Sequence, residues 1–134
     1  MKSFASIFIQ MVIFLLFTNC REKLEEPVSF FENYDVSSGR YKLEIHQVEG
    51  ELIDDFRNFY IDDPLTLNKM KRQWVFKYKS DIKSCGYGYL IALKEDNKSI
   101  KQTLVNLDCE YMSGWIYFPK KYLLDHKNHF KRID

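Results

Sequence analysis

Two histidines near the C-terminus have a spacing that could bind a metal ion. His126 and His129 are three positions apart, so a helix would place both imidazoles on one face. Imidazole is a common zinc ligand, and an acidic residue could complete a catalytic site. The same face carries Tyr122, Phe130 and Ile133, which favours two histidines packed among apolar side chains. We therefore predict no metal site, with a small secreted hydrolase or metal-dependent enzyme using His126 and His129 as the alternative.

Four aspartates form two adjacent pairs that could bind calcium or act as acid and base. The calcium-loop pattern Asp-x-Asp-x-Asp-Gly is absent, and adjacent residues of a helix do not face each other. We predict that the first pair, Asp54 and Asp55, lies on a solvated helix face, and that the second pair, Asp62 and Asp63, lies at a helix cap. Asp63 is predicted to cap a helix that begins at Pro64. Because nucleophile elbows and glycine-rich phosphate loops are also missing, we predict no catalytic residue and no cofactor.

Two of the three cysteines flank a predicted β-hairpin. Cys85 precedes the apolar segment Tyr87–Leu93, and Cys109 follows Ile100–Leu107, with a polar turn centred on Asn97 between them. In an antiparallel hairpin with this centre the two cysteines face each other, about 4.5–5.5 Å apart, within the reach of a disulfide. We predict a disulfide bond, with two buried free thiols as the alternative. A zinc site is disfavoured because no second ligand pair is nearby.

The third cysteine, Cys20, ends a short apolar N-terminus. Lys2 is the only charge before it, and Phe4–Phe17 is about 14 residues, too short to span a hydrocarbon core of about 30 Å comfortably. A charged start followed by a short apolar core is typical of a secretory signal. The cysteine followed at once by the polar run Arg21–Glu26 resembles a bacterial lipoprotein signal, in which the cysteine is acylated and becomes the first residue.

This resemblance implies three segments. Residues 1–19 would be a signal peptide, residues 20–29 a tether lipidated at Cys20 with palmitate among its acyl chains, and residues 30–134 one domain. Ordinary secretion and a retained membrane anchor are the alternatives. The expected location is the bacterial cell envelope, with the chain lipid-anchored on the periplasmic face or the cell surface. An oxidising compartment agrees with the predicted disulfide.

Size and charge limit the classes of function. Removing residues 1–19 from the 134 leaves 115, enough for one core but not for two domains. The signal contains Lys2 and no acid, so 19 basic and 19 acidic residues remain and the mature chain is formally neutral. We therefore predict no nucleic-acid partner.

Periodicity predicts the elements that position these residues. Glu51–Ile61 is interpreted as a helix because most of its large apolar residues fall within about 120° at 100° per residue, namely Leu52, Ile53, Phe56, Phe59 and Tyr60. A second strand, with Glu49-Gly50 as a turn, is the alternative. Strands are expected at Arg40–Val48, Trp74–Lys79, the hairpin and Trp115–Phe118, and helices at Pro64 and from Pro119 to Ile133.

The order of elements predicts an α+β fold. We expect a small antiparallel sheet with a disulfide-stapled hairpin and one or two helices on one face, including a C-terminal helix. Adjacent rings in a strand cannot all enter one core, so the last strand must expose rings or be covered by a helix. Tyr111, Trp115 and Tyr117 are the candidate contact residues.

The sequence lacks recognisable catalytic motifs and has more aromatic side chains than one core can bury, and both observations favour binding over catalysis. We predict a membrane-anchored, non-enzymatic envelope lipoprotein whose domain binds another macromolecule, with a protein as the partner. An immunity-like inhibitor and an assembly accessory both fit this description.

Overall fold

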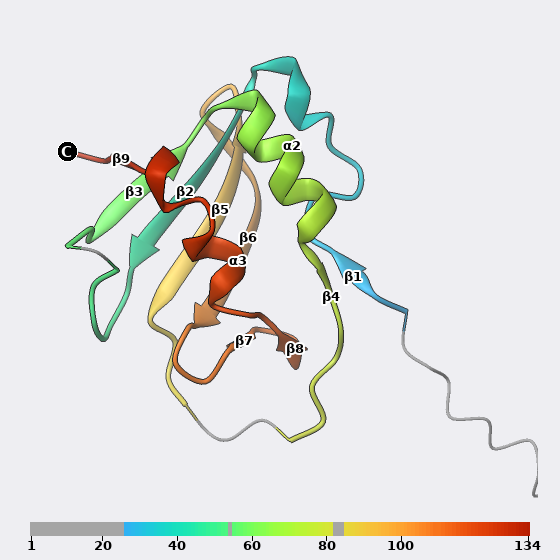
Figure 1. The fold of residues 1–134 in the computed structure, drawn as a ribbon, viewed down its shortest axis with the longest axis vertical. Helices are drawn as coiled ribbons and strands as arrows, with labels where there is room; N and C mark the ends of the chain where they lie inside the picture. The colour runs from blue at the N-terminus through green and yellow to red at the C-terminus, as the bar shows by residue number, and fades with distance from the viewer. Residues whose placement is uncertain (1–25, 54, 82–84) are drawn as a thin grey trace, which may run out of the picture.

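The computed structural model describes residues 26–53, 55–81 and 85–134. Within these residues one antiparallel sheet has the strand order β8-β7-β6-β5-β2-β3-β9, and a separate ladder joins β1 to β4 (Figure 1). The strands are β1 (Val28–Ser29), β2 (Tyr41–Gln47), β3 (Asn58–Ile61), β4 (Val75–Phe76), β5 (Tyr89–Glu95), β6 (Lys98–Asn106), β7 (Tyr111–Met112), β8 (Ile116–Tyr117) and β9 (Lys131–Arg132). The helices are α2 (Pro64–Gln73) and α3 (Lys121–Leu124), with 3-10 turns at Val36–Ser38 and Lys127–His129. The described chain includes no helix that is long and apolar enough to span a membrane.

The core lies between one face of the sheet and both helices. Alternate strand residues such as Leu43, Ile45 and Ile91 are fully buried, in the same cluster as Met70 of α2 and Leu123 of α3. In Figure 1 both helices accordingly lie on the same side of the sheet. The sequence-based expectation of a small α+β domain is confirmed.

Helix α2 begins and ends as the sequence predicts. Asp63 is its N-cap and accepts hydrogen bonds from Thr66 N at 2.8 Å and Thr66 Oγ1 at 2.5 Å, which lowers the pKa of the carboxyl. Pro64 occupies the first turn. At the other end the Trp74 indole is fully buried and donates to the carbonyl of Tyr122 at 3.1 Å, which ties α2 to α3.

The predicted helix at Glu51–Ile61 is wrong. Its last four residues form β3, which pairs with β2 so that Ile61 lies opposite Leu43 and Phe59 opposite Ile45. Phe59 and Ile61 alternate into the core, and this long-range pairing outweighs a helical stripe that local spacing also allowed. The strand alternative therefore holds for residues 58–61.

The single helix expected from Pro119 to Ile133 is not confirmed. Helix α3 is four residues long and is followed by the 3-10 turn and then by β9, which pairs with β3. Phe130 stacks on Phe59 with ring centroids 4.0 Å apart. Pairing along the open edge of β3 and this ring contact compete successfully with helix propagation.

The β5–β6 hairpin has the predicted register. Tyr89 lies opposite Val105 and Ile91 opposite Thr103, with an irregularity after Leu93. The turn residues Asp96 and Asn97 have φ values of 47° and 67°, a conformation that both residue types tolerate. On the open face of the sheet, β5 is joined to β2 by Lys94 and Glu44, whose Nζ and Oε2 are 2.7 Å apart.

Candidate functional site

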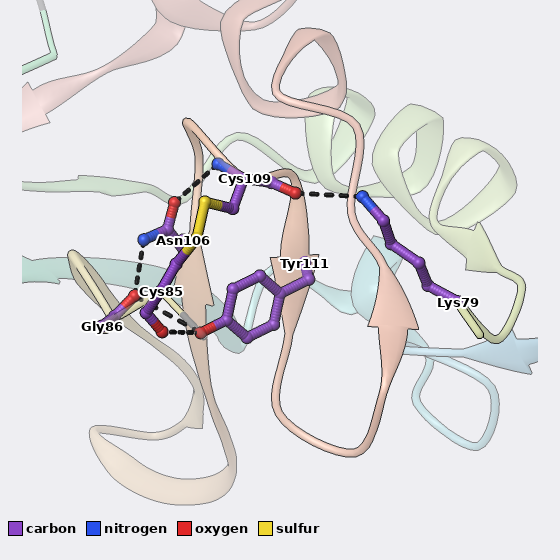
Figure 2. Close-up of a disulfide and its surroundings, with 6 residues drawn as sticks. All are labelled: Lys79, Cys85, Gly86, Asn106, Cys109 and Tyr111. Carbon is purple, nitrogen blue, oxygen red and sulfur yellow. Dashed lines mark hydrogen bonds between the residues drawn. A yellow bond between two sulfur atoms is a disulfide. The ribbon is translucent and has the colours of Figure 1, made fainter. Parts of the chain in front are cut away.

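A disulfide bond joins Cys85 to Cys109 with 6.7 Å between their Cα atoms, which confirms the predicted bond (Figure 2). Neither cysteine lies in a strand: Cys85 precedes Tyr89, where β5 begins, and Cys109 follows Asn106, where β6 ends. The expected staple between paired strand residues at the open end of the ladder is therefore not confirmed. The bond instead joins the two segments that leave the open end of the hairpin.

Asn106 holds both of these segments beside the disulfide. Its Oδ1 accepts from the Cys109 backbone N–H at 2.8 Å, and its Nδ2 donates to the carbonyl of Gly86 at 2.5 Å (Figure 2). The neighbouring Gly88 also lies close to another segment, because a Cβ added there would be 3.1 Å from the carbonyl oxygen of Glu49. The glycine at position 88 therefore allows a close approach between two backbone segments.

Two further side chains, one from β7 and one from the segment after β4, bond to the carbonyls of the disulfide cysteines. The Tyr111 hydroxyl donates to the carbonyl of Cys85, and Lys79 Nζ donates to the carbonyl of Cys109 at 3.1 Å (Figure 2). Tyr111 is only 5% exposed, and its ring packs against Tyr87 with centroids 5.3 Å apart. Of the three candidate contact residues, Tyr111 therefore lies beneath the surface and supports it.

Trp115 and Tyr117 lie on the surface. They are 64% and 38% exposed, whereas Ile116 and Phe118 between and beyond them are buried. This is the alternation expected of a strand with one face in the core. Of the two arrangements that the sequence allowed, the structure has the exposed rings rather than a covering helix.

The β7–β8 turn holds Trp115 in an unusual backbone conformation. Gly114 and Trp115 have φ values of 92° and 62°, and the left-handed region is unfavourable for a bulky side chain, by about 1 kcal/mol or more. The exposed indole gains little burial in return. The sequence therefore places a large ring where glycine or asparagine would suit folding better.

The segment after β4 runs alongside β8 and contributes two lysines. Tyr117 N donates to the carbonyl of Lys77 at 2.8 Å, Lys79 N donates to the carbonyl of Trp115 at 2.7 Å, and Tyr78 lies opposite Ile116. Lys79 Nζ is 5.4 Å from the centre of the Tyr117 ring. We call Trp115, Tyr117, Tyr78, Lys77 and Lys79 the aromatic–lysine surface.

This surface borders a hollow. The hollow has a volume of about 420 Å³ and is lined by Tyr78, Lys79, Ser80, Gly114 and Trp115. A hollow between two exposed rings suits the insertion of a side chain from another molecule. The sequence predicted Trp115 and Tyr117 as contact residues but did not indicate that Lys77 and Lys79 lie beside them. Their alternation with Trp74, Phe76 and Tyr78 was the available signal.

A second hollow of about 400 Å³ lies at the open end of the β5–β6 hairpin. Its charged lining residues are Glu49, Glu51, Asp108 and Lys120, with Lys120 Nζ 3.7 Å from Asp108 Oδ1. These carboxylates show no partner arrangement that would activate a nucleophile or a water molecule.

His126 and His129 differ in their exposure to solvent. His126 is half-buried, with Nε2 2.9 Å from Gln73 Oε1, and its burial lowers the pKa of the imidazole. His129 is exposed. Within residues 26–53, 55–81 and 85–134, no group of three His, Cys, Asp or Glu side chains could hold a metal ion.

Some predicted residues lie elsewhere. Asp55 is exposed, outside any helix, and Asp62 Oδ1 accepts from Lys131 Nζ at 2.6 Å. Asp54 and Cys20 lie outside the described residues, as do residues 1–19 and the tether before Glu26. In comparisons with models of protein families, with curated proteins and with solved structures, nothing matches this chain.

Proposed function

We propose that this chain is a lipid-anchored envelope protein that acts by binding a protein partner through its aromatic–lysine surface. The observation that carries the proposal is the display of Trp115. Trp115 is 64% exposed and has a left-handed backbone conformation that is unfavourable for a bulky side chain, so it contributes little to folding. Contact with another molecule explains why a tryptophan is present there. Tyr117 and Tyr78, at 38% and 45% exposure, extend the same surface. An immunity-like inhibitor or an assembly accessory would use such a surface.

The contact is tested by site-specific cross-linking in the native host. A photoreactive phenylalanine analogue replaces Tyr117 in one strain and Leu65 in another. Leu65 is the matched control because it is 75% exposed but lies on α2. We expect a partner to cross-link from position 117 and not from position 65.

The energetic contribution is then measured with that partner after purification. Trp115→Ala and Tyr117→Ala should each weaken its affinity by more than about 1 kcal/mol, whereas Leu65→Ala leaves it unchanged. Wild-type affinity in both ring variants would contradict the proposal. So would a substrate turnover by the purified chain that His126→Ala and His129→Ala abolish, since the enzyme alternative would then hold.

The lipid anchor has its own test. Cys20→Ala should move the protein from the membrane fraction to the soluble fraction, and the intact mass should fall by the mass of the acyl groups. Unchanged partitioning together with an unchanged adduct mass would reject lipidation at Cys20. The result is independent of the binding experiment, because Cys20 is not one of the residues that form the aromatic–lysine surface.

A further inference from the structure

The outer edge of the segment after β4 has main-chain groups that face away from the sheet. The Lys77 carbonyl and the Lys79 N–H point toward β8, because they bond to Tyr117 and Trp115. Successive residues of a strand direct their N–H and C=O groups to opposite edges, so those of Tyr78 point outward. In the part of the chain that the structure describes, neither group has a hydrogen-bond partner.

Strand β1 uses this same edge immediately before Tyr78. Phe30 N donates to the carbonyl of Trp74 at 3.2 Å, and Val28 lies opposite Phe76. β1 begins at Val28 and does not extend toward Tyr78, because the residue before it is Pro27, which has no N–H to donate. In Figure 1 the chain after β4 runs down the border of the fold, with β8 on its inner side. The edge at Tyr78 thus continues the line of β1 but is left without a paired strand among the described residues.

The charges beside this edge are positive. Lys77 is exposed and Lys79 half-buried, and neither forms an ion pair with a carboxylate of residues 26–53, 55–81 or 85–134. Lys79 instead binds the Cys109 carbonyl and lies over the Tyr117 ring. Carboxylates brought to this edge would find two cations without acidic partners.

We propose that the partner contributes an extended acidic segment that adds a strand at Tyr78. Its main chain would pair with the outward N–H and C=O of Tyr78, its carboxylates would lie near Lys77 and Lys79, and one side chain would enter the hollow beside Trp115. This inference rests on the proposed function and specifies how the partner binds. Short edge segments flanked by lysines are protected from pairing with copies of themselves, which favours a partner of opposite charge.

Three blocked hexapeptides serve as probes against the full chain purified in detergent. One alternates threonine and glutamate, the second replaces glutamate with lysine, and the third is the glutamate peptide with N-methylated amides. Binding is followed by the amide proton shift and hydrogen exchange of Tyr78. The glutamate peptide should bind at least about tenfold more tightly than the other two and slow exchange at Tyr78.

A charge reversal sharpens the test. Lys77→Glu should reverse the preference between the glutamate and lysine peptides, because the lysine side chain is exposed and only its carbonyl is used in the sheet. Lys98→Glu is the matched control, since Lys98 is an exposed lysine at the far end of β6. It should leave the preference unchanged.

Three results would overturn the inference. Equal binding of the N-methylated peptide would exclude strand pairing, and equal binding of the lysine peptide would exclude recognition of acid. Concentration-dependent self-association that protects Tyr78 would assign the edge to a second copy of the chain. If no peptide binds although Trp115→Ala still weakens the cross-linked partner, strand addition fails while the proposed function stands. If the ring variants also bind normally, both fail.

Discussion

The β5–β6 and β7–β8 hairpins reverse the chain with the same kind of backbone but with different residues. Asp96 and Asn97 occupy the left-handed positions of the first turn, whereas Gly114 and Trp115 occupy those of the second. Asp96 is also held by Arg40, whose Nε lies 3.0 Å from Oδ2. The first hairpin is built from residues that suit its conformation. The second includes a tryptophan that does not, which suggests that its turn was selected for what it displays.

The two hairpins also differ in what anchors them. β5 is paired along its whole length and is tied across the open face by Glu44, which is 5% exposed and contacts Lys42, Lys94 and His46. β7 and β8 are two residues each and depend on Tyr111 and Lys79, which bond to the carbonyls of the disulfide cysteines. The proposed contact surface thus lies in the region with less regular structure, which is supported by a covalent bond.

Removal of the disulfide should have the largest effect on the free energy of unfolding, and it should destabilise the β7–β8 hairpin more than the β5–β6 hairpin. Closing a loop of about 25 residues is worth up to roughly 3.5 kcal/mol in unfolding free energy by the chain-entropy estimate. We expect Cys85→Ser with Cys109→Ser to lose much of this in urea denaturation. Hydrogen exchange should accelerate in β7 and β8 more than in β5. A uniform acceleration would show that the disulfide does not anchor the second hairpin selectively.

Acid should weaken the region around the first hairpin. Burial opposes ionisation of Glu44, but hydrogen bonds from Lys94, Lys42 and His46 outweigh it and lower its pKa to about 2, from an ordinary value near 4.5. A lowered folded-state pKa stabilises the fold above about pH 4.5, and the contribution disappears as the pH falls toward 2. The loss from this group should be on the order of 2 to 3 kcal/mol.

Glu44→Gln checks this pH dependence. The variant should be less stable than wild type at pH 6, and the difference should narrow toward pH 2, as measured by urea denaturation across that range. Asp62→Asn is the control, because its ion pair with Lys131 is at the surface and contributes less than about 1 kcal/mol. A constant difference between Glu44→Gln and wild type would contradict the assignment.

Replacing the strained tryptophan should separate folding from binding. Trp115→Asn keeps a residue that tolerates positive φ and removes a ring that is mostly exposed. Stability should be unchanged or raised by up to about 1 kcal/mol, while partner affinity falls by more than about 1 kcal/mol. Urea denaturation and the cross-linked partner provide the two measurements. A variant that is clearly less stable than wild type would mean that the indole stabilises the turn.

A substitution at the equivalent turn position of the β5–β6 hairpin should have the smallest effect on stability and on partner affinity. Asn97→Gly introduces a residue that also suits φ 67°, so the stability should stay within about 0.5 kcal/mol of wild type. Partner affinity should not change. Thermal unfolding of Asn97→Gly and Trp115→Asn compares the two turns directly. A larger change in melting temperature for Asn97→Gly would contradict the view that only the β7–β8 turn carries an unfavourable residue.

Sequence patterns predicted the parts of the fold that depend on neighbouring residues. The centre of the β5–β6 hairpin followed from two apolar runs around Asn97, and the start of α2 followed from Asp63 and Pro64. Residues 58–61 were misassigned because Phe56, Phe59 and Tyr60 also fit a helical stripe. Their strand structure comes from pairing with β2, which local spacing does not encode.

The candidate site was predictable in part for the same reason. Alternation in the last strand showed that rings must leave the core, and the structure exposes Trp115 and Tyr117 while it buries Tyr111. Which side of the strand faces inward depends on contacts with Cys85, Trp74 and Phe76, residues distant in sequence. The lysines at positions 77 and 79 join the rings only through pairing between segments far apart in the chain.

The central position of β5 also determines an order of assembly. β5 and β6 are joined by a two-residue turn and can pair early, whereas β2 reaches β5 only by closing a loop from Gln47 to Tyr89. β2 and β3 therefore cannot join the rest of the sheet until the β5–β6 hairpin has formed. Folding should be slow and cooperative, with a transition state that contains the hairpin and little of β3.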